Sequence, residues 1–111
     1  MTNTLPRAED STRHLALQYL VLAFSRLRIR DDALRYLEDL LGFLAADPAA
    51  RLPEGRTRGE LGSAYLDDLS RNGSCPEFDF EWLRDDPGFK DTLQRHRGQF
   101  AAVHAIPGAP G

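Results

Sequence analysis

Leucines recur at spacings of three and four residues in the first half of the chain, and this repeat is the strongest constraint on the fold. It places the leucines on one face of an α-helix, which has about 3.6 residues per turn. The helix is predicted to begin at Asp31 and to end before Pro48. The chain must supply further elements to bury that face. The face consists of Leu34, Leu37, Leu41 and Leu44, widened by Ala33, Leu40 and Phe43.

The segment before this helix is apolar on almost every side. Within residues 15–24 only Gln18 is polar, so a helix capped by Asp10 or Ser11 and running to Leu27 has no wide polar face. A helix that is apolar all round is typical of a buried position, and we expect this one to be central. The short link to the leucine helix predicts an antiparallel hairpin.

A third helix is predicted over residues 57–72. Thr57 and Glu60 have the spacing of a capping box, in which a hydroxyl and a carboxylate each satisfy a free backbone donor at the helix start. Gly73 suits the helix end because it adopts a positive φ without strain.

A fourth helix is predicted from Pro87 to about His104. Asp86 is a capping residue, and proline is favoured at the first helical position. Gly98 inside this helix costs up to about 1 kcal/mol relative to alanine.

The fold class predicted from these elements is all-α, a small bundle of about four helices. A chain of 111 residues has room for one domain. We place that domain at residues 9–106, between disordered tails at 1–8 and 107–111.

Acidic and aromatic residues alternate over residues 75–83, which we call the strap, between the third and fourth helices. In an extended backbone, alternation with a period of two separates the two residue types onto opposite sides. Either the aromatic rings close one end of the helical core, or they form a docking surface for another protein. The aromatic side carries Phe78, Phe80 and Trp82, and the acidic side carries Glu77, Asp79 and Glu81.

The net charge of −3 is unevenly distributed. Residues 1–58 hold nine basic and eight acidic side chains, for a net charge of +1, and residues 59–111 hold five and nine, for a net charge of −4. An acidic second half argues against binding to nucleic acid, whose phosphates dominate affinity, and suits a basic protein partner. The bias toward arginine over lysine is typical of GC-rich bacterial or phage genomes.

The single cysteine, Cys75, excludes an internal disulfide and any thiolate cluster for a metal. This composition favours a reducing compartment, so the expected location is the cytoplasm. The longest apolar run, residues 15–24, is about half of the roughly 20 residues that a membrane-spanning helix needs. We therefore expect no contact with a membrane.

No catalytic, cofactor-binding or metal-binding residue is assigned, and no cofactor is expected. The histidines are His14, His96 and His104, and no acid or thiol lies three or four residues from His96 or His104 to complete a metal site. His96 falls on a predicted apolar stripe with Leu93 and Phe100, which favours a buried, hydrogen-bonded side chain over a catalytic base.

Cys75 is not expected to be a nucleophile. Glu77 and Asp79 stand close to it in the sequence, and negative charge raises the pKa of a thiol.

A group of arginines near the first predicted turn raises the alternative of a helix-turn-helix DNA-binding protein. The second helix of that motif would carry four acids, which phosphates repel. Compensation of the helix dipole, and ion pairs of Arg28 and Arg35 with Asp31, Asp32 or Glu38, explain the arginines without DNA. The arginines are Arg26, Arg28, Arg30 and Arg35, and the acids are Asp31, Asp32, Glu38 and Asp39.

The leading hypothesis is a small non-enzymatic protein that binds another protein, as a regulator, assembly factor or inhibitor. An acidic mimic of nucleic acid that inhibits a nucleic-acid-binding enzyme is an alternative, because residues 77–91 hold six acids against two basic residues. A homodimer is open as well, through the apolar first helix. The expected partner surface is Glu77, Phe78, Asp79, Phe80, Glu81, Trp82 and Asp85.

Overall fold

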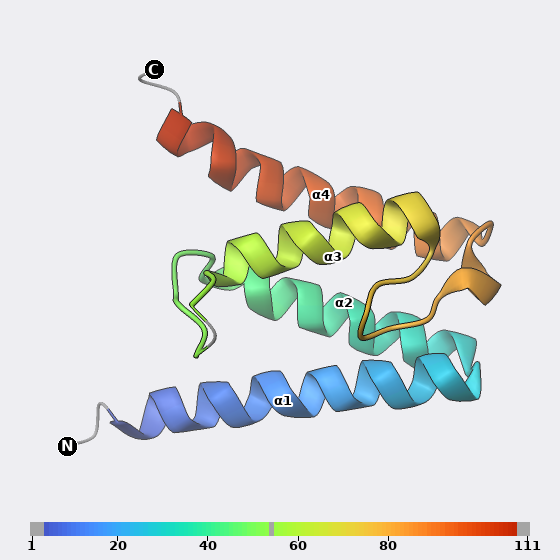
Figure 1. The fold of residues 1–111 in the computed structure, drawn as a ribbon, viewed down its shortest axis with the longest axis horizontal. Coiled ribbons are helices and arrows are strands. Elements are labelled where there is room, and N and C mark those ends of the chain that lie inside the picture. The colour runs from blue at the N-terminus through green and yellow to red at the C-terminus, as the bar shows by residue number, and fades with distance from the viewer. Residues whose placement is uncertain (1–3, 54, 109–111) are drawn as a thin grey trace.

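The protein is an all-α bundle of four helices, as predicted (Figure 1). The computed structural model describes residues 4–53 and 55–108, with side chains over 12–53 and 55–100. Within these residues there is no β-strand, only isolated bridges between Arg51 and Thr57 and between Ser74 and Asp79. The helices are α1 (Thr4–Leu27), α2 (Arg30–Ala46), α3 (Arg58–Asn72) and α4 (Pro87–Gly108), and a 3-10 turn, η1 (Glu81–Leu83), precedes α4.

Helix α2 occupies the centre of the fold, because it packs against all three other helices. Its predicted leucine stripe is largely confirmed: Leu37, Leu41 and Leu44 are fully buried, together with Ala33 and Leu40. Figure 1 shows α1 and α4 at opposite edges, with α2 and α3 between them. The buried leucines of α2 therefore connect α1 on one side of the bundle with α3 and α4 on the other.

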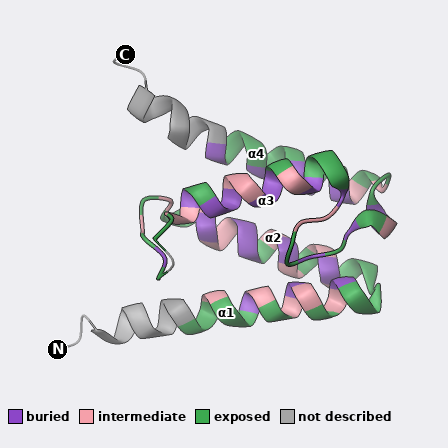
Figure 2. Cartoon of the chain, in the orientation of Figure 1, coloured by how far each residue is buried: buried purple, intermediate pink, exposed green. Residues whose placement is uncertain are grey.

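The prediction that the first helix is central was wrong. Helix α1 packs chiefly against α2, and its outer side faces solvent, where Leu15 is 55% and Tyr19 68% exposed (Figure 2). The reason lies in the strap, since Phe78 and Phe80 fill space beside α3 and α4 that a central first helix would have filled. Only Val21 and Leu17 of α1 are hydrophobic residues of the buried core among the described side chains.

Local sequence signals at three helix ends are confirmed. The Thr57 hydroxyl accepts a hydrogen bond from the Glu60 amide at 3.1 Å, and the Glu60 carboxylate accepts one from the Thr57 amide at 2.8 Å, which completes the capping box. Gly73 ends α3 with φ of 78° and donates its N–H to the carbonyl of Leu69. Asp86 caps α4 immediately before Pro87, as described below.

Several helix limits differ from the predicted ones. Helix α1 begins at Thr4 rather than near residue 10, and α4 continues to Gly108 past the predicted end near His104. Helix α2 begins one residue earlier than predicted, at Arg30. Residues 1–3 and 109–111 of the predicted tails lie outside the described residues, and the domain limits 9–106 stay a prediction.

Helices α3 and α4 come close together where a glycine faces an aromatic ring. Gly62 on α3 is buried, and a Cβ atom at this position would overlap the ring of Phe100 on α4. By contrast, a Cβ atom at Gly42 or Gly98 would meet nothing within 4 Å. The contact between α3 and α4 therefore depends on the missing side chain of Gly62.

We expect Gly62→Ala to lower the free energy of unfolding by about 1–2 kcal/mol, because overpacking against Phe100 outweighs the gain in helix propensity. Gly98→Ala is the matched control, and it should raise stability by about 0.5–1 kcal/mol. Guanidinium unfolding followed by circular dichroism measures both. Equal stabilisation by the two substitutions would contradict the close approach at Gly62.

Candidate functional site

The strap is a tight loop followed by a helical turn, not the continuous extended segment that was predicted. The amide of Cys75 donates to the carbonyl of Phe78 at 2.9 Å, and the amide of Phe78 donates back to Cys75 at 3.2 Å. The amide of Phe80 donates to the carbonyl of Gly73 at 2.9 Å, and residues 81–83 then form the turn η1. The strap is thereby tied to the end of α3.

The aromatic side of the strap belongs to the core. Phe78 is 2% and Phe80 0% exposed. The Phe78 ring lies 5.2 Å from that of Tyr65 on α3, and the Phe80 ring lies 5.3 Å from that of Phe89 on α4, centroid to centroid. The interpretation that these rings close the core is confirmed for Phe78 and Phe80, and neither side chain is accessible to a partner in this structure.

Trp82 is half-buried at the edge of this aromatic cluster. Its ring stacks on Phe80, with centroids 6.4 Å apart and planes inclined by 17°. Its indole Nε1 donates a hydrogen bond to the carbonyl of Asp79 at 2.8 Å. The 3-10 turn inverts the alternation here, since Leu83 rather than Trp82 is the next buried side chain. Part of the indole therefore stays at the surface in a fixed orientation.

The acidic side of the strap faces solvent. We call Glu77, Asp79, Glu81 and Asp85, all of them exposed, the acidic edge. Among the described residues none of these four carboxylates forms an ion pair. Asp79 accepts a hydrogen bond from the Glu81 amide at 3.2 Å, which holds the backbone between them. The period-two pattern predicted this outward direction correctly.

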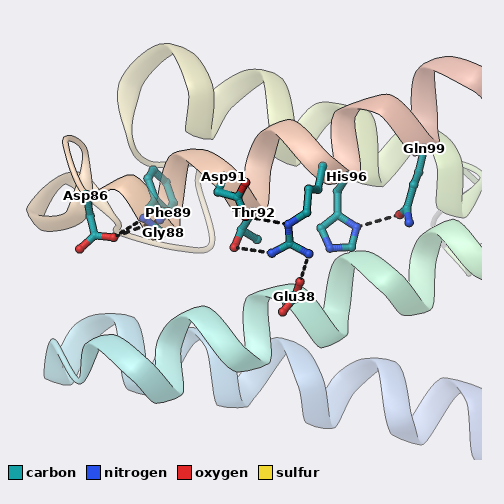
Figure 3. A network of polar contacts seen from close by, with 9 residues as sticks. Glu38, Asp86, Gly88, Phe89, Asp91, Thr92, His96 and Gln99 are labelled. Atoms are coloured by element: carbon teal, nitrogen blue, oxygen red, sulfur yellow. Dashed lines mark hydrogen bonds and ion pairs between the residues drawn. The ribbon is translucent and has the colours of Figure 1, made fainter.

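Several acids elsewhere on the surface have arginine partners. Arg95 on α4 pairs with Glu38 on α2 and with Asp91 one turn away on α4 (Figure 3). Arg97 lies 3.5 Å from Asp67 on α3. The Arg95–Glu38 and Arg97–Asp67 pairs link neighbouring helices, whereas the carboxylates of the acidic edge form no ion pair among the described residues.

Asp86 anchors the end of the strap to two helices. Its carboxylate accepts hydrogen bonds from the amides of Gly88 and Phe89 at 2.8 and 3.1 Å, which caps α4 (Figure 3). The same carboxylate accepts bonds from Arg30 of α2, from Nε at 2.7 Å and from Nη2 at 3.0 Å. The Arg30 guanidinium, helped by the two amides, lowers the pKa of Asp86 to about 2.

The prediction of which arginines form ion pairs near the first turn was wrong. Arg30, not Arg28 or Arg35, makes the pairs near the first turn, with Asp31 and Asp86. Arg35 instead stacks over the Tyr36 ring, 5.5 Å from its centroid. Arg30, for which no ion pair was predicted, thus pairs with one neighbouring and one distant carboxylate.

A groove of about 380 Å³ separates the strap from α1, and no sequence pattern predicted it. It arises because the strap, rather than α1, covers the end of the core. Gln18 on its wall donates a hydrogen bond to the Tyr65 hydroxyl at 2.8 Å, connecting α1 to α3. Its lining is Leu15, Gln18, Tyr19, Leu22 and Arg26 of α1 with Pro76, Glu77 and Phe78 of the strap.

A second groove, of about 370 Å³, lies between α3 and α4. Leu69, Phe89 and Leu93 form its apolar floor, and Arg84 and Lys90 line it with Asp85 of the acidic edge. The acidic edge therefore borders an apolar groove on this side, and positive charge is present there as well.

His96 is buried, as predicted, and its Nδ1 lies 2.8 Å from the amide oxygen of Gln99. His14 stacks on the Phe43 ring, and the side chain of His104 lies outside the described residues. Burial raises the pKa of the Cys75 thiol to about 11, with the charge of Glu77 adding to the effect. Within the described part of the chain, no three His, Cys, Asp or Glu side chains are grouped as metal ligands.

Comparison with protein-family models, with curated proteins and with solved structures finds no match. Among the described residues, no helix has both the length and the hydropathy that crossing a membrane requires.

We expect Phe80→Ala to cost about 3–5 kcal/mol of unfolding free energy, because it leaves a cavity between the strap and α4. Trp82→Ala should cost less, about 1–2 kcal/mol, since its ring is only partly buried at the edge of the cluster. Chemical denaturation of both variants gives the comparison. The reverse order would mean that Trp82, not Phe80, anchors the strap.

The Asp86 contacts predict a specific loss of stability in acid. The unfolded carboxyl, with a pKa near 3.9, takes up its proton first as the pH falls, so the contribution of Asp86 is complete above about pH 4 and is lost toward pH 2. Asp86→Asn should therefore lose less stability than the wild type between pH 5 and about pH 2. Urea unfolding at a series of pH values measures the difference.

Asp39→Asn is the control, because Asp39 is exposed and has no ion pair among the described residues. Its acid profile should follow that of the wild type. If Asp86→Asn did so too, the Arg30–Asp86 contact would contribute nothing to folding.

Proposed function

We propose that this chain is a small, non-enzymatic protein-binding module whose docking surface is the acidic edge together with Trp82. The observation that carries the proposal is the set of four exposed carboxylates that form no ion pair in the described structure, on the same short segment as a partly exposed indole. Phe78 and Phe80 belong to this proposal only as anchors, because both are buried.

The chemistry of this surface selects a basic partner. Uncompensated carboxylates attract cationic side chains and accelerate association with them. An indole with a fixed orientation supplies a hydrophobic contact at small entropic cost, and tryptophan is enriched among residues that dominate binding energy. We therefore expect a basic protein with an apolar pocket for the exposed part of Trp82.

The core side of the strap supports this proposal through rigidity. Two buried rings and three backbone hydrogen bonds hold the loop that carries the carboxylates. A surface that is already ordered avoids most of the entropy that a flexible acidic segment loses on binding.

The proposal places no chemistry on the chain itself. A buried thiol with a raised pKa is a poor nucleophile, and His96 contacts an amide oxygen rather than an acid. A cytoplasmic location belongs to the same proposal and has its support in the single cysteine.

Mimicry of nucleic acid is a second candidate, favoured by the same uncompensated carboxylates. The strap is a tight loop followed by a 3-10 turn, so Glu77, Asp79 and Glu81 form only a short patch of charge. Competition by duplex DNA, and an affinity that falls steeply with salt, would distinguish a mimic from a module that also depends on Trp82.

We expect a photo-crosslinking amino acid at position 81 to capture a partner in cells of the source organism. The same amino acid at position 39, on the exposed side of α2, is the matched control and should not capture that protein. Mass spectrometry of the crosslinked product identifies both the partner and the contact. Equal capture from both positions would count against the acidic edge.

A charge-neutral variant then tests the chemistry. Glu77→Gln, Asp79→Asn and Glu81→Gln, combined, should weaken binding of the captured protein about tenfold or more, while helicity is unchanged. The control removes three charges elsewhere on the chain, through Asp39→Asn, Asp47→Asn and Asp68→Asn. Full binding by the strap variant would overturn the proposal.

A further inference from the structure

The polar lining of the groove between α3 and α4 consists almost entirely of side chains that donate hydrogen bonds. Three of them are cations, one is an amide and one is a hydroxyl, and a single acid stands among them. In a chain with a net charge of −3, this groove is a local excess of positive charge. The donors are Ser70, Arg84, Lys90, Gln94 and Arg97, and the acid is Asp85.

The donors reach the groove from α4 and from the loop that precedes it. Lys90, Gln94 and Arg97 follow one another at intervals of four and three, which places them on one side of α4. At 1.5 Å per residue, Lys90 and Arg97 start about 10.5 Å apart along the helix axis. Arg84 follows the turn η1 directly and lies before α4 begins. All three cations are exposed, so a ligand in the groove can contact them from solvent.

Two of these cations have no counter-ion, and the third is held in place by α3. Among the described residues neither Arg84 nor Lys90 forms an ion pair. Nη2 of Arg97 donates to the Ser70 hydroxyl at 3.0 Å, and its Nη1 lies 3.5 Å from a carboxylate oxygen of Asp67. Because the Ser70 oxygen accepts this bond, its own proton is available to a ligand. An incoming anion therefore meets one oriented guanidinium and two cations that it need not draw away from a carboxylate.

The apolar floor of the groove is almost closed to water. Leu69 and Phe89 are each 1% exposed, and Leu93 is 6% exposed. Hydrophobic stabilisation scales with the apolar area removed from water, so this floor has little to offer an apolar ligand. Recognition must then rest on charge and hydrogen bonds. These select a ligand with many acceptor oxygens, and both guanidinium and ammonium groups bind phosphate well.

We propose that this groove binds a small molecule that carries two linked phosphates, such as a nucleoside diphosphate. Three cations and one acid leave two positive charges, which suit a diphosphate better than a single carboxylate. The volume of about 370 Å³ is that of a site for a small molecule. Because the floor is nearly closed, affinity depends on the diphosphate and only weakly on the group attached to it.

The first test locates the site with inorganic pyrophosphate as the probe, in an NMR titration of the full-length ¹⁵N-labelled chain. The amides of Ser70, Lys90 and Gln94 should shift together and saturate with a Kd below about 1 mM. Lys90→Gln should weaken binding about tenfold or more, because it removes a charge-assisted contact. Arg13→Gln removes the same charge at an exposed site on α1 and should leave the Kd unchanged. Shifts that do not saturate, or equal weakening by both variants, would overturn the proposal.

The second test compares ligands at this site by the same titration. ADP should bind within about threefold of pyrophosphate, and inorganic phosphate should bind about tenfold more weakly. Raising the salt concentration should weaken all three. Tighter binding of hexaglutamate than of pyrophosphate would assign the groove to an acidic protein segment and contradict the proposal.

The third test uses Asp85→Asn, which removes the one acid of the groove. It should tighten pyrophosphate binding about threefold, since a repelling charge is lost. The same substitution removes a carboxylate of the acidic edge, so the proposed function predicts weaker binding of the captured protein. The two proposals give opposite signs for one variant and can therefore fail separately. Unchanged or weaker pyrophosphate binding by Asp85→Asn would count against the groove.

Discussion

Burial of the leucine face of α2 is the interaction on which the rest of the structure depends. Five of its side chains are fully excluded from water, and α2 is the one helix that packs against the other three. Removing apolar surface from water contributes about 25 cal/mol per Å². These side chains therefore stabilise the fold only when both sides of α2 are covered. Helix α1 covers one side, and α3, α4 and the strap cover the other.

The strap completes this core and in doing so determines what the surface presents. Because Phe78 and Phe80 point inward, the alternation of side chains turns the neighbouring carboxylates outward. The Arg30–Asp86 contact and the cap of α4 then hold the end of the strap. One segment therefore serves both stability and the proposed recognition, and the two roles fall on opposite sides of the same backbone.

Features encoded within a few residues could be predicted from the sequence. The capping box at Thr57, the glycine end of α3 and the cap at Asp86 each rest on contacts between near neighbours in the chain. Period-two alternation places Phe78 and Phe80 on the side opposite Glu77 and Asp79, and the structure shows that the aromatic side faces the core. These signals are local, and tertiary packing did not override them.

Features that depend on distant partners could not be predicted. An apolar run such as residues 15–24 has the same pattern in a central helix and in an edge helix with one side exposed. The choice of Asp86 as the partner of Arg30 joins residues 56 positions apart, and no spacing rule encodes it. The groove beside α1 exists only because the strap took the place expected for α1.

The central claim is that Trp82 is partly exposed beside carboxylates that form no ion pair among the described residues. Collisional quenching of its fluorescence tests this directly, because Trp82 is the single tryptophan of the chain. Relative to free N-acetyltryptophanamide, caesium ions should quench the folded protein more effectively than iodide, since the carboxylates attract one ion and repel the other. Both should quench less than in the unfolded chain. Quenching by iodide equal to or stronger than that by caesium, or no protection on folding, would contradict the account.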